Sequence, residues 1–372
     1  MYNKHTPVIE LDIDGCKVVR IRRLLNPEYL PLGLPASSEP EKFTKWIAKR
    51  KIPESREGLM VARRDFPDFE AYRHMFSLSD QYWFSYGEGD VWDSLNFFTN
   101  KYDPRVGKVF FTPWEVDPKE AFGESPDLTT NGALRKRWKQ SKNGTSWLIK
   151  AGSKTLNQEP ISEVLATMLL RKLQIIPFVE YELVVDGMRL CSRCKNFIGP
   201  DTEFVPAIHI YQKEPRRKDE TIYAHLLKMC VLHGVYGAKE YVDNMIAVDR
   251  IIGNKDRHLG NFGFIRDVNT LEITGFAPLF DSGYAFTEEA QGTIRESKFA
   301  KQEPEALRKM LRRIKSSEFL DHQDMFILID QYPELDKNQK QVIKDKIAAA
   351  EKEMRGLIKD FERVSPTAEI GR

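Results

Sequence analysis

Short strand-like runs and one amphipathic helix alternate through residues 133–198, and a mostly helical segment follows them. The helix is predicted from apolar residues that recur at helical spacing between Ile161 and Leu173. The strand-like runs are 133–139 and 145–150 around Asn143-Gly144, and 178–185 and 188–198 around Asp186-Gly187. The later helices are predicted at about 220–233, 238–252, 303–315, 318–332 and 338–363. Strands followed by helices favour an α+β fold with two lobes over a doubly wound parallel sheet. A cleft between such lobes is a natural ligand site.

The segment "NKDRHLGN" (254–261) places charged and amide side chains between apolar runs. Gly253 is expected to end the preceding helix, because glycine adopts the left-handed cap conformation easily. Two short strands follow the loop, and "PLFDSG" then carries Asp281. A helix, a polar loop and a hairpin would bring Asp256, Asn261 and Asp281 to one end of the same small structure. Two carboxylates and an amide oxygen are hard ligands that suit Mg²⁺.

Phosphoryl transfer needs such a metal, a base for the acceptor hydroxyl and a cation on the phosphates. Lys150 ends the strand "SWLIK" and can be that cation, and Glu163 in the first turn of the next helix can pair with it. The polar loop that includes Asn131 and ends in Gly132 can cover phosphates with backbone N–H groups. Each residue alone has an ordinary structural explanation. Their order along the chain, however, is the order of the functional parts in protein kinases.

The motifs "NKDRHLGNFGF" and "FAPLFDSG" resemble the kinase core of the HipA-like family. The resemblance covers roughly residues 125–330 and implies a protein-kinase-like, or phosphatidylinositol-kinase-like, fold. It implies that Asp256 is the catalytic base and that Asn261 and Asp281 hold Mg²⁺. It also implies that Lys150 contacts the phosphates of ATP.

The resemblance assigns supporting roles to other residues. His258 would orient the base or brace the loop of the metal site. Members of the family can inactivate themselves by phosphorylating a serine in the glycine-rich loop, and this chain offers Thr129 and Thr130 instead. The hinge under adenine would be formed by Asn196, Phe197 and Ile198.

The predicted function is therefore an ATP- and Mg²⁺-dependent serine/threonine protein kinase that acts on a protein substrate. The catalytic motif reads N-x-D-R-H and the metal motif FDSG, which argues against the eukaryotic class with its H-R-D and D-F-G motifs. Two alternatives stay open. One is a small-molecule or lipid kinase on the same fold, and the other is a non-catalytic, kinase-like regulatory module of a toxin–antitoxin complex. Known family members are toxins inhibited by a DNA-binding antitoxin, so an antitoxin-type partner is part of the hypothesis.

Four regions are expected along the chain. An α/β region specific to the family (1–118) would pack on the small lobe (119–199), followed by the large lobe (200–365) and a loose tail (366–372). The N-terminal region is expected to open with a hairpin that turns at Asp14-Gly15. Its aromatic-rich stretch 78–98 is interpreted as packing, because no basic residues interleave with the rings.

Charge and cysteine content narrow the class of protein. The 57 basic and 55 acidic residues leave a formal charge of +2, so no global field favours nucleic acid or an anionic membrane. The basic run 135–142 is interpreted as a solvated strand or loop. Four cysteines do not form a disulfide scaffold, and Cys191 and Cys194 are expected to be buried in a strand rather than to bind zinc. We expect a cytoplasmic protein without a membrane segment and without direct nucleic-acid binding.

Overall fold

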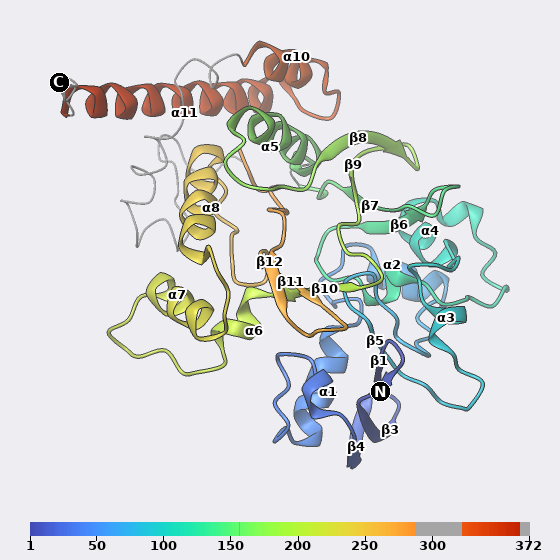
Figure 1. Ribbon diagram of the computed structural model, residues 1–372. Helices are drawn as coiled ribbons and strands as arrows, with labels where there is room; N and C mark the ends of the chain where they lie inside the picture. The colour runs from blue at the N-terminus through green and yellow to red at the C-terminus, as the bar shows by residue number, and fades with distance from the viewer. Residues whose placement is uncertain (156, 287–321, 365–372) are drawn as a thin grey trace.

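The structure is a computed structural model, and it describes residues 1–155, 157–286 and 322–364. The helix predicted at 303–315, the start of the one at 318–332 and the tail 366–372 lie outside these residues. Within them, no helix is long and apolar enough to span a membrane. In Figure 1 the long C-terminal helix lies at the opposite end of the molecule from the N-terminal strands.

The centre of the small lobe is a four-stranded antiparallel sheet with the strand order β6-β7-β9-β8. The strands are β6 (Lys136–Gln140), β7 (Ser146–Ala151), β8 (Tyr181–Asp186) and β9 (Arg189–Lys195). The helix α5 (Glu159–Leu173) spans the predicted helical residues, has a proline in its first turn and packs against β8 and β9. Cys191 and Cys194 are free and buried in β9, which confirms the strand interpretation.

The large lobe combines a short sheet with helices. Its three-stranded sheet has the order β10-β11-β12. The strands are β10 (Thr202–Pro206), β11 (Gly263–Asp267) and β12 (Ile273–Phe276). The helices are α6 (Ala207–Tyr211), α7 (Ile222–Leu232), α8 (Ala238–Ile252), α10 (Gln323–Gln331) and α11 (Lys337–Val364). Apolar residues of α5, α7, α8, α10 and α11 form one core, and Figure 1 shows α5 between α11 and the small sheet.

The N-terminal residues form two small β-units and several short helices. The strands are β1 (Tyr2–Asn3), β2 (Thr6–Pro7), β3 (Ile9–Asp14), β4 (Lys17–Leu24) and β5 (Tyr82–Trp83). The α-helices are α1 (Pro40–Lys49), α2 (Leu59–Asp65), α3 (Trp92–Leu95) and α4 (Arg105–Phe111). The 3-10 helices are η1 (Pro27–Tyr29), η2 (Pro113–Glu115) and η3 (Pro126–Thr129).

The N-terminal region and the small sheet share one hydrophobic core. Leu59 of α2 and Phe110 of α4 are buried with Ile149 of β7 and Cys191 of β9. Most rings of the aromatic stretch 78–98 also pack, as predicted, and Trp83, Trp92 and Phe97 are buried in one cluster with Trp138 of β6. The predicted boundaries after residues 118, 199 and 365 stay predictions.

Two hairpin turns lie one residue later in the chain than predicted, and they differ in turn type. The first was predicted one residue too early, because Asp14 pairs with Lys17 and the two turn residues are Gly15 and Cys16. Gly15 has φ +58° whereas Cys16 has negative φ, which is the pattern of a type II′ turn and not of the expected I′ turn. In the β8–β9 hairpin Asp186 pairs with Arg189, so the turn residues are Gly187 and Met188 and not the predicted Asp186-Gly187. Both have positive φ, as a type I′ turn requires.

Candidate active site

A buried lysine connects three elements of the fold. Lys150 of β7 has a 9% exposed side chain, and its Nζ lies 2.9 Å from Glu163 Oε1 and 2.8 Å from Asp281 Oδ1. It also donates to the hydroxyl of Tyr181 at 3.3 Å. The second oxygen of Glu163 accepts from the backbone N–H of Ser282 at 2.9 Å. The strand lysine, the helix glutamate and the late aspartate of the sequence prediction therefore meet at one point.

The charges in this cluster stabilise one another. Burial disfavours the Lys150 ammonium, but Asp281 and Glu163 together raise its pKa well above the usual value. Burial also disfavours the Asp281 carboxylate, yet Lys150 and Lys136 hold its pKa well below its usual range. For Glu163 burial outweighs Lys150 and raises the pKa. Lys150 and Asp281 are thus a charged pair at neutral pH.

The loop after α8 is held by a fully buried ion pair. Gly253 has φ +64° and ends α8, as predicted. Arg257 Nε and Nη2 donate to the two carboxylate oxygens of Asp249 at 2.9 and 3.0 Å, and both side chains are 0% exposed. Arg257 Nη1 also donates to the carbonyls of Asn261 at 2.8 Å and Phe280 at 2.6 Å. One guanidinium therefore ties the loop to α8 and to the residue before Asp281.

The predicted base and its neighbours lie on this loop. Asp256 is accessible to solvent, yet desolvation by the surrounding loop, together with the Asp281 charge, raises its pKa above the usual value. His258 is also exposed, and its Nδ1 accepts from the N–H of Gly260 at 3.0 Å, which fits bracing of the loop. The Asn261 amide nitrogen donates to the carbonyl of Asp256 at 3.1 Å.

Two oxygens of this region suit a magnesium ion. The Asp281 side chain is 41% exposed and uses only Oδ1 in its pair with Lys150. Asn261 Oδ1 accepts no hydrogen bond from the described residues, while its nitrogen is held by the loop. Hard oxygens and few protein ligands match Mg²⁺, which leaves other positions to phosphate and water. No group of three or more His, Cys, Asp or Glu side chains with metal-site geometry occurs in the described part of the chain.

A second lysine, which the sequence analysis missed, lies under the glycine loop. Lys136 of β6 is the cross-strand partner of Lys150, and a Cβ added to Gly132 would lie 2.2 Å from Lys136 Nζ. Burial, with the positive charges of Lys150 and Arg56, lowers the pKa of Lys136 to about 7. The interpretation of 135–142 as solvated was wrong for this part. Lys136 is half-buried, and its neighbour Arg137 is buried and pairs with Asp186.

The glycine loop and the predicted hinge are shaped by internal hydrogen bonds. Gly132 has φ +103°, which favours glycine, and its N–H donates to Asn131 Oδ1 at 2.7 Å. At the hinge, the N–H of Ile198 donates to Asn196 Oδ1 at 3.2 Å, so this N–H is already engaged. Phe197 packs on the ring of Phe280, with a centroid distance of 5.7 Å, beside Asp281.

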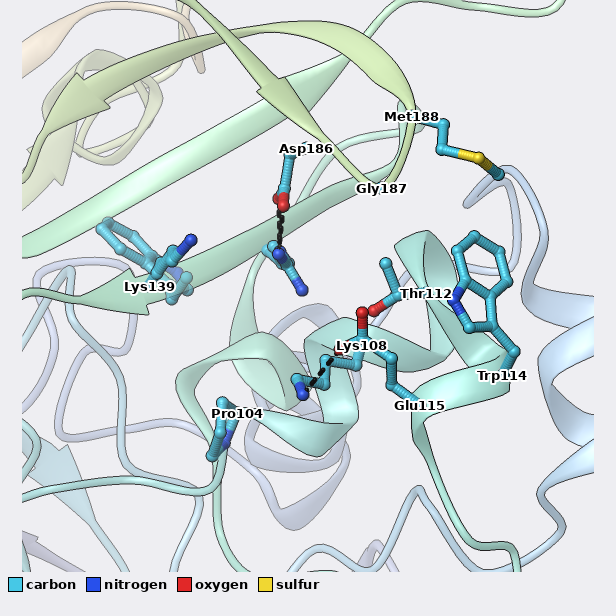
Figure 2. A pocket seen from close by; sticks show the side chains of 11 residues that line it. Pro104, Lys108, Thr112, Trp114, Glu115, Lys139, Asp186, Gly187 and Met188 are labelled. Carbon is cyan, nitrogen blue, oxygen red and sulfur yellow. Dashed lines mark hydrogen bonds and ion pairs between the residues drawn. The ribbon is translucent and has the colours of Figure 1, made fainter.

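A cavity of about 680 Å³ lies away from these residues, between α4 and the β8–β9 turn. Figure 2 shows Trp114 and Met188 at one side of it and the pair of Lys108 with Glu115 across from the ion-paired Asp186. None of the predicted site residues lines this cavity. The prediction made from the motifs therefore concerns the Lys150 cluster and the loop that follows α8, not this cavity.

The lysine–glutamate pair lies in the small lobe and the Asp256–Asn261 loop in the large lobe. Two lobes with these parts define a protein-kinase-like fold. A scan against protein-family models finds no match. Among curated proteins, the serine/threonine-protein kinase CtkA of Helicobacter pylori is 25% identical over 205 residues, which are 50% of this chain and 58% of that protein. The match thus spans less than two thirds of the relative's length.

Solved structures show the same fold over more of the chain. The proinflammatory kinase CtkA of Helicobacter pylori aligns with 62% of this chain and 95% of its own, with a TM-score of 0.51 and 18% identity. HipA of Shewanella oneidensis MR-1, solved with HipB and operator DNA, aligns with 98% of this chain and 99% of its own, with a TM-score of 0.55 and 13% identity. These similarities confirm the α+β, HipA-like kinase fold and the resemblance seen in the motifs. The roles of single residues stay predictions.

Proposed function

We propose that this chain is an ATP- and Mg²⁺-dependent serine/threonine protein kinase that transfers the γ-phosphoryl group to a protein hydroxyl. The observation that carries the proposal is the meeting of Lys150 with Glu163 and Asp281, at distances of 2.9 and 2.8 Å. Lys150 and Asp281 are in contact although they lie 131 positions apart in the sequence. A kinase requires these residue types for its phosphate and metal sites. The similarity to CtkA supports the proposal independently.

Each side chain then has a defined task. Lys150 and Lys136 bind the phosphates, and Glu163 holds Lys150 in place. Asp256 accepts the proton of the attacking hydroxyl, for which it must be ionised. Asn261 and Asp281 would hold Mg²⁺, which when bound neutralises charge on the phosphates. Arg257 keeps the catalytic loop and the segment before Asp281 in register.

The hydroxyls of both loop threonines are engaged. Thr129 Oγ1 donates to the carbonyl of Phe76 at 2.7 Å. Thr130 Oγ1 donates to the carbonyl of Pro126 at 2.7 Å and accepts from Trp138 Nε1 at 2.8 Å. Autophosphorylation of either threonine therefore requires that the loop first opens. An antitoxin-type partner belongs to the proposal because the similar HipA was solved with HipB.

The direct test is incubation with γ-labelled ATP and Mg²⁺, alone and with a cell lysate, followed by peptide mapping. We expect label on serine or threonine of protein bands, and label on peptides that contain Thr129 or Thr130 would identify autophosphorylation. Label in extracted metabolites or lipids instead would favour the other kinase hypothesis. Nucleotide binding without any ATP consumption would contradict the proposal.

Lys136 makes nucleotide binding depend on pH. With a pKa of about 7 in the free protein, its ammonium is increasingly lost as the pH rises above neutrality. Phosphate groups favour the charged form, so ATP binding at pH 8 is expected to take up a proton and to weaken as the pH rises further. Calorimetry in two buffers with different ionisation enthalpies measures this uptake. Lys136→Met is expected to lower the proton uptake and to weaken ATP binding by about tenfold. Proton uptake equal to that of the wild type would contradict the assignment of the uptake to Lys136.

A further inference from the structure

Arg56 of the N-terminal region binds the glycine loop across 76 residues of sequence. It lies just before α2, is 3% exposed, and donates from Nε to the carbonyl of Gly132 at 2.7 Å and from Nη2 to that of Thr130 at 2.6 Å. The next residue continues the contact, because the N–H of Glu57 donates to the carbonyl of Ala133 at 2.7 Å. Three carbonyls of the loop are thus bound by two consecutive residues.

The surroundings of Arg56 suit this task. In the part of the chain that the structure describes, no carboxylate forms an ion pair with its guanidinium, and its hydrogen bonds go to the two loop carbonyls. Burial outweighs the distant charge of Asp127 and lowers the pKa of Arg56 to about 10, which still leaves it charged. The Phe110 ring centroid lies 5.9 Å from its Cζ. Burying a cation without a carboxylate partner costs free energy. The two hydrogen bonds to loop carbonyls therefore compensate for the burial of the Arg56 guanidinium.

The bound carbonyls fix the direction of the neighbouring N–H groups. In a trans peptide the C=O of one residue and the N–H of the next point to opposite sides. The carbonyls of Thr130, Gly132 and Ala133 point to residues 56 and 57, so the N–H groups of Asn131, Ala133 and Leu134 point away from them. These three N–H groups donate to no acceptor among the described residues. Three free N–H groups within four residues, next to the Lys136 ammonium, form an anion-binding surface.

We propose that Arg56 is a positioning residue of the nucleotide site, which orients the glycine loop so that its free N–H groups face the phosphates of ATP. The inference rests on the proposed kinase function and makes the N-terminal region part of the ATP site. Arg56 acts through the loop and does not touch the nucleotide.

The test compares Arg56→Gln and Arg56→Lys with the control Arg64→Gln. Arg64 lies on α2, is exposed and pairs with its neighbour Asp65, so its loss leaves the loop untouched. In nucleotide-free protein, Arg56→Gln is expected to speed hydrogen exchange of the peptide 125–140, whose bonded amides include Leu128 and Trp138. Arg56→Lys, which can reach one carbonyl, is expected to restore part of the protection.

The kinetic readout separates positioning from general damage. Arg56→Gln is expected to raise the KM for ATP about tenfold, with kcat at saturating ATP changed by less than about threefold. Unchanged exchange and unchanged KM would overturn the proposal, and so would a raised KM with unchanged exchange. If exchange is faster in the variant but the wild type does not bind ATP, the kinase function is refuted, while the conclusion that Arg56 orders the loop still stands. If Arg56→Gln does not fold, the same comparison is made with Arg56→Lys.

Discussion

Asp256→Asn is expected to lower the rate of phosphoryl transfer by about 10²–10⁴-fold while ATP binding stays near that of the wild type. Asparagine has the same shape but cannot accept the proton of the attacking hydroxyl. The Asp256 side chain is exposed on its loop, so the substitution leaves no buried group unsatisfied. Single-turnover phosphorylation and nucleotide titration of the same preparation measure the two effects.

The pH dependence gives a second readout for this residue. A base must be ionised, and partial burial with the Asp281 charge raises the pKa of Asp256. Wild-type activity is therefore expected to fall as the pH drops through this raised value, and the residual activity of the variant should lack that acidic limb. Asp219→Asn, at an exposed carboxylate far from the loop in sequence, serves as the control. Equal rates of wild type and Asp256→Asn would refute the base assignment, and loss of ATP binding would indicate a structural role instead.

Local sequence signals predicted the scaffold of the site well. The helix from Glu159 to Leu173 and the strands around it have clear periodicity, and Gly253 ends α8 where a left-handed cap was expected. The predicted strand beginning at 133 starts only at Lys136, because residues 56 and 57 bind the loop before it. Periodicity carries no information about such a distant partner.

The residues that the sequence analysis missed act through tertiary contacts. Lys136 was interpreted as part of a solvated run and Arg56 carried no motif signal, and only the fold brings both to Gly132. Tyr181 begins a strand and gave no signal that its hydroxyl would reach Lys150. Asp249 offered one usable signal, since an acid on the apolar side of a predicted helix needs a buried partner. The order of the motifs predicted which functional residues meet. The residues that hold them in place could not be inferred from sequence spacing.

The Asp249–Arg257 pair yields the largest expected effect on stability. Asp249→Leu leaves a fully buried guanidinium without its carboxylate, so the free energy of unfolding is expected to fall by about 3–5 kcal/mol. Arg257→Met removes the donor of two carbonyls and leaves the Asp249 carboxylate, among the described residues, with the Asn254 amide as its one remaining donor. A loss of similar size is expected. Urea denaturation of both variants measures these losses, and Asp249→Asn is a milder substitute if Asp249→Leu does not fold.

The double variant shows whether the two residues act as a unit. Asp249→Leu with Arg257→Met buries no unpaired charge, so it is expected to lose about 3 kcal/mol less than the sum of the single variants. Phosphoryl transfer should nevertheless stay low in the double variant, because the carbonyls of Asn261 and Phe280 still lack the guanidinium that holds them. Additive losses would show that the pair is not coupled. Recovery of activity together with stability would show that Arg257 supports only the fold, and that the loop keeps its geometry without it.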